Sequence, residues 1–170
     1  MARNQSTVLN ILARIGALAE DTLLVAFLLV LIGLSGLQIF LRNVMGTGFF
    51  WSDELLRILV LWLGILGAVA ASRDDKHISI DVLTRFLPTH AVNYIRVAVD
   101  AFTCAVCGLI AWNASGFIQM EKEFGATVLG DLPAWLFEII LPVGFGLISY
   151  RYAVFAVVHL KKALAGGGVE

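Results

Sequence analysis

Two charged residues lie more than two helical turns inside stretches that are otherwise apolar enough to cross a membrane. Asp100 belongs to the apolar run of residues 91–117, and Arg151 belongs to that of residues 133–160. An unpaired charge near the centre of such a span costs on the order of 3 kcal/mol. Counted from the same membrane side, both residues lie at a similar depth, which predicts an Asp100–Arg151 ion pair between two helices. The alternative is a local pair between Arg96 and Asp100, four residues apart on one helix.

A transport role is the second interpretation of Asp100. A small four-helix transporter or channel would use this carboxylate as its proton or cation site. Proton relays in membranes normally place several carboxylates along one path. A single acidic residue with an arginine available to pair with it favours a structural role, so stand-alone transport is the alternative function.

The stretch FFWSDELLRILVLW places three charges at the start of an apolar run. Ser52 is suited to cap a helix N-terminus, and the positive end of the helix dipole favours Asp53 and Glu54 there. Arg57 follows them by four and three residues, so all three charges share one helix face. This face, with Trp51, is either a capped helix end with a local ion pair or a surface that meets another protein in the membrane.

Small residues follow on the same predicted helix, in the stretch GILGAVAA. Gly64 and Ala68 are four residues apart, as are Gly67 and Ala71. This spacing lets two helix backbones approach closely in lipid. It serves contact within the bundle as well as contact with a partner.

The polar stretch SRDDKHISIDVLTRFLP follows the second apolar run. Its distinctive polar residues are Arg73, His77 and Asp81. Apolar residues at helical spacing, ended by Pro88, predict a short helix on the inner membrane surface. No full metal-ligand set accompanies the histidine, so we predict a polar hairpin connection and no metal site.

Composition indicates a membrane protein of one domain. The 170 residues are 59% hydrophobic and 15% charged, whereas soluble domains are about 25% charged. The formal net charge of −1 gives a nucleic-acid partner no electrostatic support. A helical span needs about 20 mostly apolar residues. Four runs meet this requirement: about 22–41, 55–71, 91–117 and 133–160.

The predicted fold is therefore all-α and integral to the membrane, with four transmembrane helices. Apolar residues at helical spacing over about residues 6–19 predict an additional amphipathic surface helix before the first span. Eight basic residues fall on the side of the two termini, and only Arg42, Arg57 and Lys122 fall on the other. The positive-inside rule then places both termini in the cytoplasm. Glu138 would join Arg42 and the charges that follow Trp51 in an outer polar layer.

Enzymatic and cofactor-dependent functions find no support in the residue patterns. No nucleophile elbow, zinc-protease, P-loop or paired-acid motif is present, so we predict no catalytic residues. Cys104 and Cys107 lack further ligands nearby and are interpreted as small apolar helix residues. The histidines are poorly placed for haem between facing helices. We predict neither a cofactor nor a substrate-binding site, which leaves a structural subunit of a larger membrane assembly.

The segment from Trp51 to Leu83 resembles the small membrane subunit, the DctQ-type small permease, of tripartite ATP-independent periplasmic (TRAP) transporters. The resemblance rests on an aromatic, acidic and basic helix start, a Gly-Ala helix, an arginine, a His-hydrophobic-x-hydrophobic-Asp stretch and a Leu-Pro end. The four-span layout also matches, and the resemblance covers about residues 20–162. The matching residues are Trp51, Glu54, Arg57, Gly67, Ala68, Arg73, His77, Ile78, Ile80, Asp81, Leu87 and Pro88.

This resemblance implies a scaffold subunit in a bacterial inner membrane. It would bind a large multi-span subunit that carries the substrate and sodium sites and moves by an elevator-type motion. A periplasmic binding protein would deliver an organic acid, of the dicarboxylate or sialic acid class, for sodium-driven uptake. The surface formed by Trp51, Asp53, Glu54 and Arg57, with Gly64, Gly67 and Ala68, becomes the candidate partner interface.

Overall fold

A computed structural model describes residues 2–46, 51–73 and 89–164 of the chain. It is almost entirely helical, and four of its helices are long and apolar enough to cross a membrane, as the sequence predicts. The predicted surface helix between the second and third spans lies outside the described residues. The elements, in chain order, are α1 (Ala2–Val44), α2 (Ser52–Ala71), α4 (Thr89–Phe124), β1 (Thr127–Val128), β2 (Leu132–Pro133), α5 (Trp135–Glu138) and α6 (Ile140–Leu164).

Helix α1 joins the predicted N-terminal surface helix and the first span into one helix of 43 residues. The predicted boundary near residue 20 is therefore not a helix end. No glycine or proline interrupts the chain there, and the Thr22 hydroxyl donates back to the Leu18 carbonyl at 2.7 Å, within the helix. A helix of this length extends about 65 Å, roughly twice the hydrocarbon thickness of a bilayer. Part of α1 must therefore tilt or project beyond the membrane.

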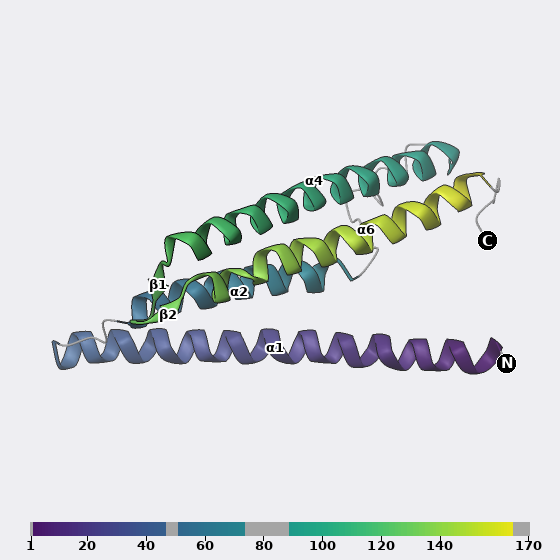
Figure 1. Cartoon of the computed structure of the whole chain (residues 1–170). Coiled ribbons are helices and arrows are strands. Elements are labelled where there is room, and N and C mark those ends of the chain that lie inside the picture. The colour runs from purple at the N-terminus through teal and green to yellow at the C-terminus, as the bar shows by residue number, and fades with distance from the viewer. Residues whose placement is uncertain (1, 47–50, 74–88, 165–170) are drawn as a thin grey trace.

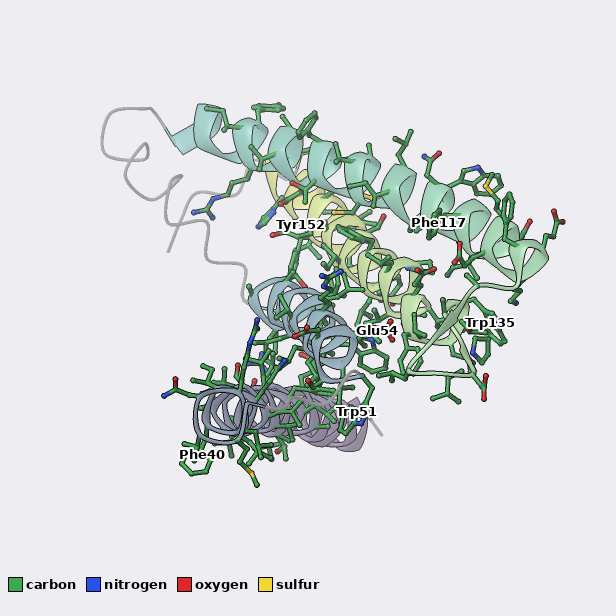
Figure 2. All side chains as sticks on the ribbon, turned by 90° about the vertical axis from the view of Figure 1, so that its left-hand side faces the viewer. Phe40, Trp51, Glu54, Phe117, Trp135 and Tyr152 are labelled. Carbon is green, nitrogen blue, oxygen red and sulfur yellow. The ribbon has the colours of Figure 1, made fainter. Side chains whose placement is uncertain are left out.

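The helices form an open row instead of a closed four-helix bundle. α1 packs on α2, α2 packs on α6, and α6 packs along α4 over most of its length. Figure 1 shows α1 and α4 at opposite edges of this row, and Figure 2 shows the same order along the helices. An open row leaves broad apolar surfaces: Trp112, Phe102 and Ile39 have 82%, 71% and 70% of their surface exposed. Lipid or another protein must cover them.

A glycine of α6 lies at a close contact with α2. A Cβ atom at Gly144 of α6 would lie 2.1 Å from Cγ2 of Ile65 in α2. Ile65, Val69 and Ile148 form the buried cluster around this contact. The close approach predicted for the glycines of α2 is therefore made inside the chain by a glycine of α6. Side chains from α2 fill the space that Gly144 leaves.

A small two-stranded ribbon connects α4 to α5. Thr127 pairs with Pro133 and Val128 pairs with Leu132 in antiparallel register. Gly130 has a φ of 98°, a conformation that glycine adopts without steric cost. The predicted fourth span begins as the short helix α5 and continues as α6. We call the end of the molecule with this ribbon and the start of α2 the hairpin end; it lies on the left of Figure 1.

Candidate functional site

The predicted Asp100–Arg151 pair is corrected by the structure, because the two side chains have different partners. Asp100 is completely buried, and its Oδ2 lies 2.7 Å from Nδ1 of His159. Arg151 instead pairs with Glu20. Arg151 lies eight residues before His159 on α6, about 12 Å along the helix and on a different face. The alternative pairing of Asp100 with Arg96 stays a prediction.

Arg151 joins three helices at the C-terminal end of α2, near the middle of α1 and of α6. Its guanidinium donates to Glu20 of α1 at 2.5 Å, to the Val69 carbonyl at 2.5 Å and to the Ser72 hydroxyl at 3.2 Å. The last carbonyls of α2 lack helical partners and carry the negative end of the helix dipole, so a cation is favourable there. Arg73 adds a contact with Asp21 at 3.1 Å. The cluster fixes α1 against α2 and α6.

Sequence reasoning missed both true partners of the two intramembrane charges. His159 lies at the end of the predicted fourth span of residues 133–160, and Glu20 follows the predicted surface helix of residues 6–19. The contact between Asp100 and His159 depends on the register and rotation of α4 against α6, and Ser149 bonds to the Cys104 carbonyl at 2.9 Å along the same pair of helices. A single sequence gives no direct signal of such a register.

The charges at the start of α2 connect to other elements. Asp53 accepts a hydrogen bond from the Gln38 amide of α1 at 2.6 Å. Glu54 accepts one from the Leu129 backbone N–H at 2.7 Å, between the two strands of the ribbon. In the described part of the chain these acidic residues thus bind α1 and the ribbon, and the predicted local pair with Arg57 is not their contact. Figure 2 shows Glu54 among these elements.

The helix start itself also differs from the prediction. The residue before the first turn of α2 is Trp51, which makes no side-chain cap hydrogen bond, and Ser52 is the first helical residue. Ser52 is buried, with 1% of its surface exposed, whereas Trp51 is 43% exposed. The aromatic side chain therefore lies partly exposed at the surface beside α1, as Figure 2 shows.

One face of α2 is open along the whole helix. Its exposed residues recur every three or four positions, and we call them the α2 stripe: Asp53, Arg57, Val60, Gly64, Ala68 and Ala71. A Cβ atom at Gly64 or at the half-buried Gly67 would meet nothing within 4 Å. The small residues that the sequence singled out therefore lie where no part of the described chain packs.

A cavity of about 160 Å³ lies at the hairpin end of the α2 stripe. Apolar side chains make most of its wall, and Arg57 and Glu138 are its charged residues. Oε2 of Glu138 is buried and has no hydrogen-bond partner among the described residues. The residues that line the cavity are Arg57, Ile58, Leu61, Val128, Ala134, Phe137 and Glu138.

The described part of the chain contains no set of side chains that could bind a metal ion. No group of three or more histidine, cysteine, aspartate or glutamate side chains is placed to hold a metal ion there. Cys104 and Cys107 are free thiols, and the sulfur of Cys104 lies 3.5 Å from the Ser149 hydroxyl. Of the predicted loop motif, Arg73 contacts α1, whereas His77 and Asp81 lie outside the described residues.

Comparison with known proteins identifies components of one class of transporter. A family model described as "Tripartite ATP-independent periplasmic transporters, DctQ component" matches residues 21–162. The sialic acid TRAP transporter permease protein SiaT of Haemophilus influenzae is 29% identical over 131 residues, 73% of this chain. The C4-dicarboxylate TRAP transporter small permease protein DctQ of Rhodobacter capsulatus is 27% identical over 108 residues, 63% of this chain.

A third relative matches over nearly its whole length. The sialic acid TRAP transporter small permease protein SiaQ of Vibrio cholerae is 24% identical over 147 residues, 86% of this chain and 84% of the relative. The chain spans only 20% of the SiaT protein and 48% of the Rhodobacter protein. The matched region therefore corresponds to a component of these transporters.

Proposed function

The chain belongs to the DctQ family of tripartite ATP-independent periplasmic transporters, and we propose on that premise that it is the small scaffold subunit of such a transporter. It binds a large multi-span membrane subunit and holds that subunit in place during transport. Members of this family are transporter components and not enzymes. Four apolar helices and these relatives indicate a multi-pass protein of the bacterial inner membrane.

The observation that carries the proposal is the open row of helices. A transporter that worked alone would enclose a polar path between its helices, but here Asp100 and Arg151, the charges furthest inside the predicted spans, contact side chains of other helices. The α2 stripe and the outer faces of α1 and α4 remain uncovered. Small residues on an open helix face suit close contact with another helix in lipid. This combination supports a role in binding over a role in moving substrate.

The partner proposals follow from the family. The large subunit carries the substrate and sodium sites and undergoes the elevator-type motion, while this chain and the surrounding lipid stay in place. A periplasmic substrate-binding protein delivers an organic acid, and relatives named for sialic acid and for C4-dicarboxylates support that class. Uptake uses the sodium gradient. Both termini lie in the cytoplasm, which puts the hairpin end on the periplasmic side, within reach of the binding protein.

The first test is purification of the tagged chain from its native membrane in mild detergent, with mass analysis of associated proteins. We expect one large multi-span membrane protein in stoichiometric amount. A chain that purifies alone would overturn the scaffold proposal. The alternative, stand-alone transport through Asp100, would then be tested by solute flux into proteoliposomes that contain only this chain.

A second test locates the interface at the hairpin end of α2. Replacing Trp51 and Arg57 together by alanine removes exposed side chains without touching the Asp53 and Glu54 contacts that hold α2. We expect at least a tenfold loss of the co-purified partner, equivalent to about 1.4 kcal/mol. Trp112→Ala is the matched control, because this tryptophan is 82% exposed on α4. Equal losses in both variants would remove the case for this surface.

A further inference from the structure

The cavity at the hairpin end is built from three elements that are far apart in the sequence. Ile58 and Leu61 of α2 form one wall, Val128 of β1 forms another, and Phe137 of α5 closes it. Glu54 fixes this arrangement, because its carboxylate accepts the Leu129 backbone N–H at 2.7 Å. The cavity is therefore a consequence of how the ribbon is held on α2.

Glu138 supplies the polar feature of the cavity that nothing in the described chain satisfies. Its Oε2 is buried and accepts no hydrogen bond there. Leaving a buried carboxylate oxygen without a donor is costly, so native structures almost always provide one. A donor from another molecule would remove this cost. Glu138 lines the cavity together with Arg57, so its carboxylate lies next to the space that such a donor would occupy.

The charges of the cavity define the chemistry of that donor. Arg57 contributes one positive charge and Glu138 one negative charge, so the pair calls for an uncharged group. The group must accept a hydrogen bond from the guanidinium and donate one to the carboxylate. A carboxamide does both with separate atoms, because its oxygen accepts and its NH₂ group donates. Its short apolar stem suits the surrounding Ile58, Leu61 and Phe137.

The position of the cavity connects it to the α2 stripe. Arg57 precedes Gly64 by seven residues, which is two helical turns or about 10 Å. A partner helix that approaches closely at Gly64, where no described atom would meet a Cβ, extends over the cavity two turns further on. We propose that the cavity receives the side chain of an asparagine or glutamine from a membrane helix of the large subunit. This inference rests on the proposed function.

Site-specific photocrosslinking tests which molecule occupies the cavity. A benzophenone amino acid replaces Leu61 or Val128 in the complex in native membranes, and mass spectrometry identifies the adducts. Replacement of Phe102 on α4, which is 71% exposed, provides the control. We expect both cavity positions to label one turn of one partner helix that contains an asparagine or glutamine. Adducts on phospholipid, or on a partner segment without either residue, would overturn the proposal.

Two substitutions of Glu138 test the hydrogen bonding. Glu138→Gln keeps the shape and can still accept a hydrogen bond, whereas Glu138→Leu removes the acceptor at similar size. We expect Glu138→Gln to retain the partner within about threefold and Glu138→Leu to lose it at least tenfold. Equal losses would show that a cation occupies the cavity, and two unchanged variants would show that nothing polar does. Either result would overturn the proposal.

The failure of this inference is distinguishable from failure of the scaffold function. If the unmodified chain purifies with a large subunit while the crosslinks fall elsewhere, the scaffold function stands and the cavity proposal fails. If the unmodified chain brings no large subunit, both fail. Yield and monodispersity of each variant chain purified alone report whether Glu138→Leu has altered folding instead of binding.

Discussion

The seam between α4 and α6 and the open face of α2 use the same kinds of residue differently. In the seam, the buried Asp100 contacts His159, and Ser149 bonds to the Cys104 carbonyl. On α2, Gly64 faces open space, and the cavity next to Arg57 is lined by Glu138 of α5, whose buried Oε2 has no donor among the described residues. Polar groups that hydrogen-bond to each other within the chain indicate a contact that holds two of its own helices together. Exposed small residues and polar groups without a hydrogen-bond partner among the described residues indicate a surface that contacts another molecule.

The largest expected effect contrasts two glycines. Gly144→Val places a branched side chain against Ile65, because even a Cβ atom would lie 2.1 Å from its Cγ2. Overpacking of this kind typically costs 1–3 kcal/mol, and we expect about 3 kcal/mol here because both helices must separate. The measurement is the free energy of unfolding of the isolated chain, by SDS titration from mild detergent micelles.

Gly64→Val is the matched control for this comparison. A side chain at Gly64 meets no described atom, so we expect a change below about 0.5 kcal/mol in the isolated chain, typical of surface substitutions. The same variant should lose the large subunit at least tenfold in co-purification. If both valine variants destabilised the isolated chain equally, the Gly144 contact between α6 and α2 would not differ from the exposed α2 stripe.

The next largest effect concerns the buried contact in the α4–α6 seam. His159→Leu removes this partner of Asp100, which is completely buried. We expect a loss of about 2 kcal/mol, because a buried carboxylate loses one of its hydrogen bonds. A double-mutant cycle with Asp100→Asn should give a coupling of about 1.5 kcal/mol, near the upper end for polar contacts between membrane helices. Additive losses would mean that the two side chains do not act together.

The sequence predicts the spans better than it predicts the contacts between them, and the reason is physical. The four spans follow from apolar length alone, because a bilayer sets that requirement. The Asp100 and Arg151 partners do not, because they depend on helix register and rotation. A shift of eight residues along α6 exchanges His159 for Arg151. Depth counting can have an error of that size when helices are longer than the membrane is thick, as α1 with 43 residues and α4 with 36 residues are.

The candidate site was predictable where it depends on exposed residues of one helix. The spacing of Arg57, Gly64 and Ala68 places them on one face whatever α2 packs against. The cavity was not predictable, because Val128 and Phe137 reach it through a ribbon that has only two-residue strands. Such short strands carry no periodic signal in the sequence. The hydrogen bond from the Leu129 N–H to Glu54 was likewise not predictable, because the two residues are 75 positions apart in the sequence.

A smaller effect is expected for the charge cluster that holds α1. Arg151 and Glu20 form a half-buried pair, with 21% and 19% of their side chains exposed. A double-mutant cycle with Arg151→Met and Glu20→Gln should give a coupling of about 1 kcal/mol, since partial solvation weakens ion pairs. The readout is SDS unfolding together with a disulfide crosslink engineered between α1 and α2. A coupling near zero would mean that Arg73 and Asp21 hold α1 without this pair.

The smallest effect is expected at the other attachment of α1, next to the α2 stripe. The Gln38–Asp53 hydrogen bond is 2.6 Å long, but both groups are reached by solvent. Gln38→Ala should therefore cost less than about 0.5 kcal/mol in the isolated chain, in the range of exposed polar pairs. If α1 is held mainly through Glu20, crosslinking between the Gln38 region of α1 and α2 will fall while the free energy of unfolding stays unchanged. A loss as large as that of the Arg151 variant would show that the two contacts of α1 contribute equally, and the contrast between the half-buried Glu20 contact and the exposed Gln38 contact would disappear.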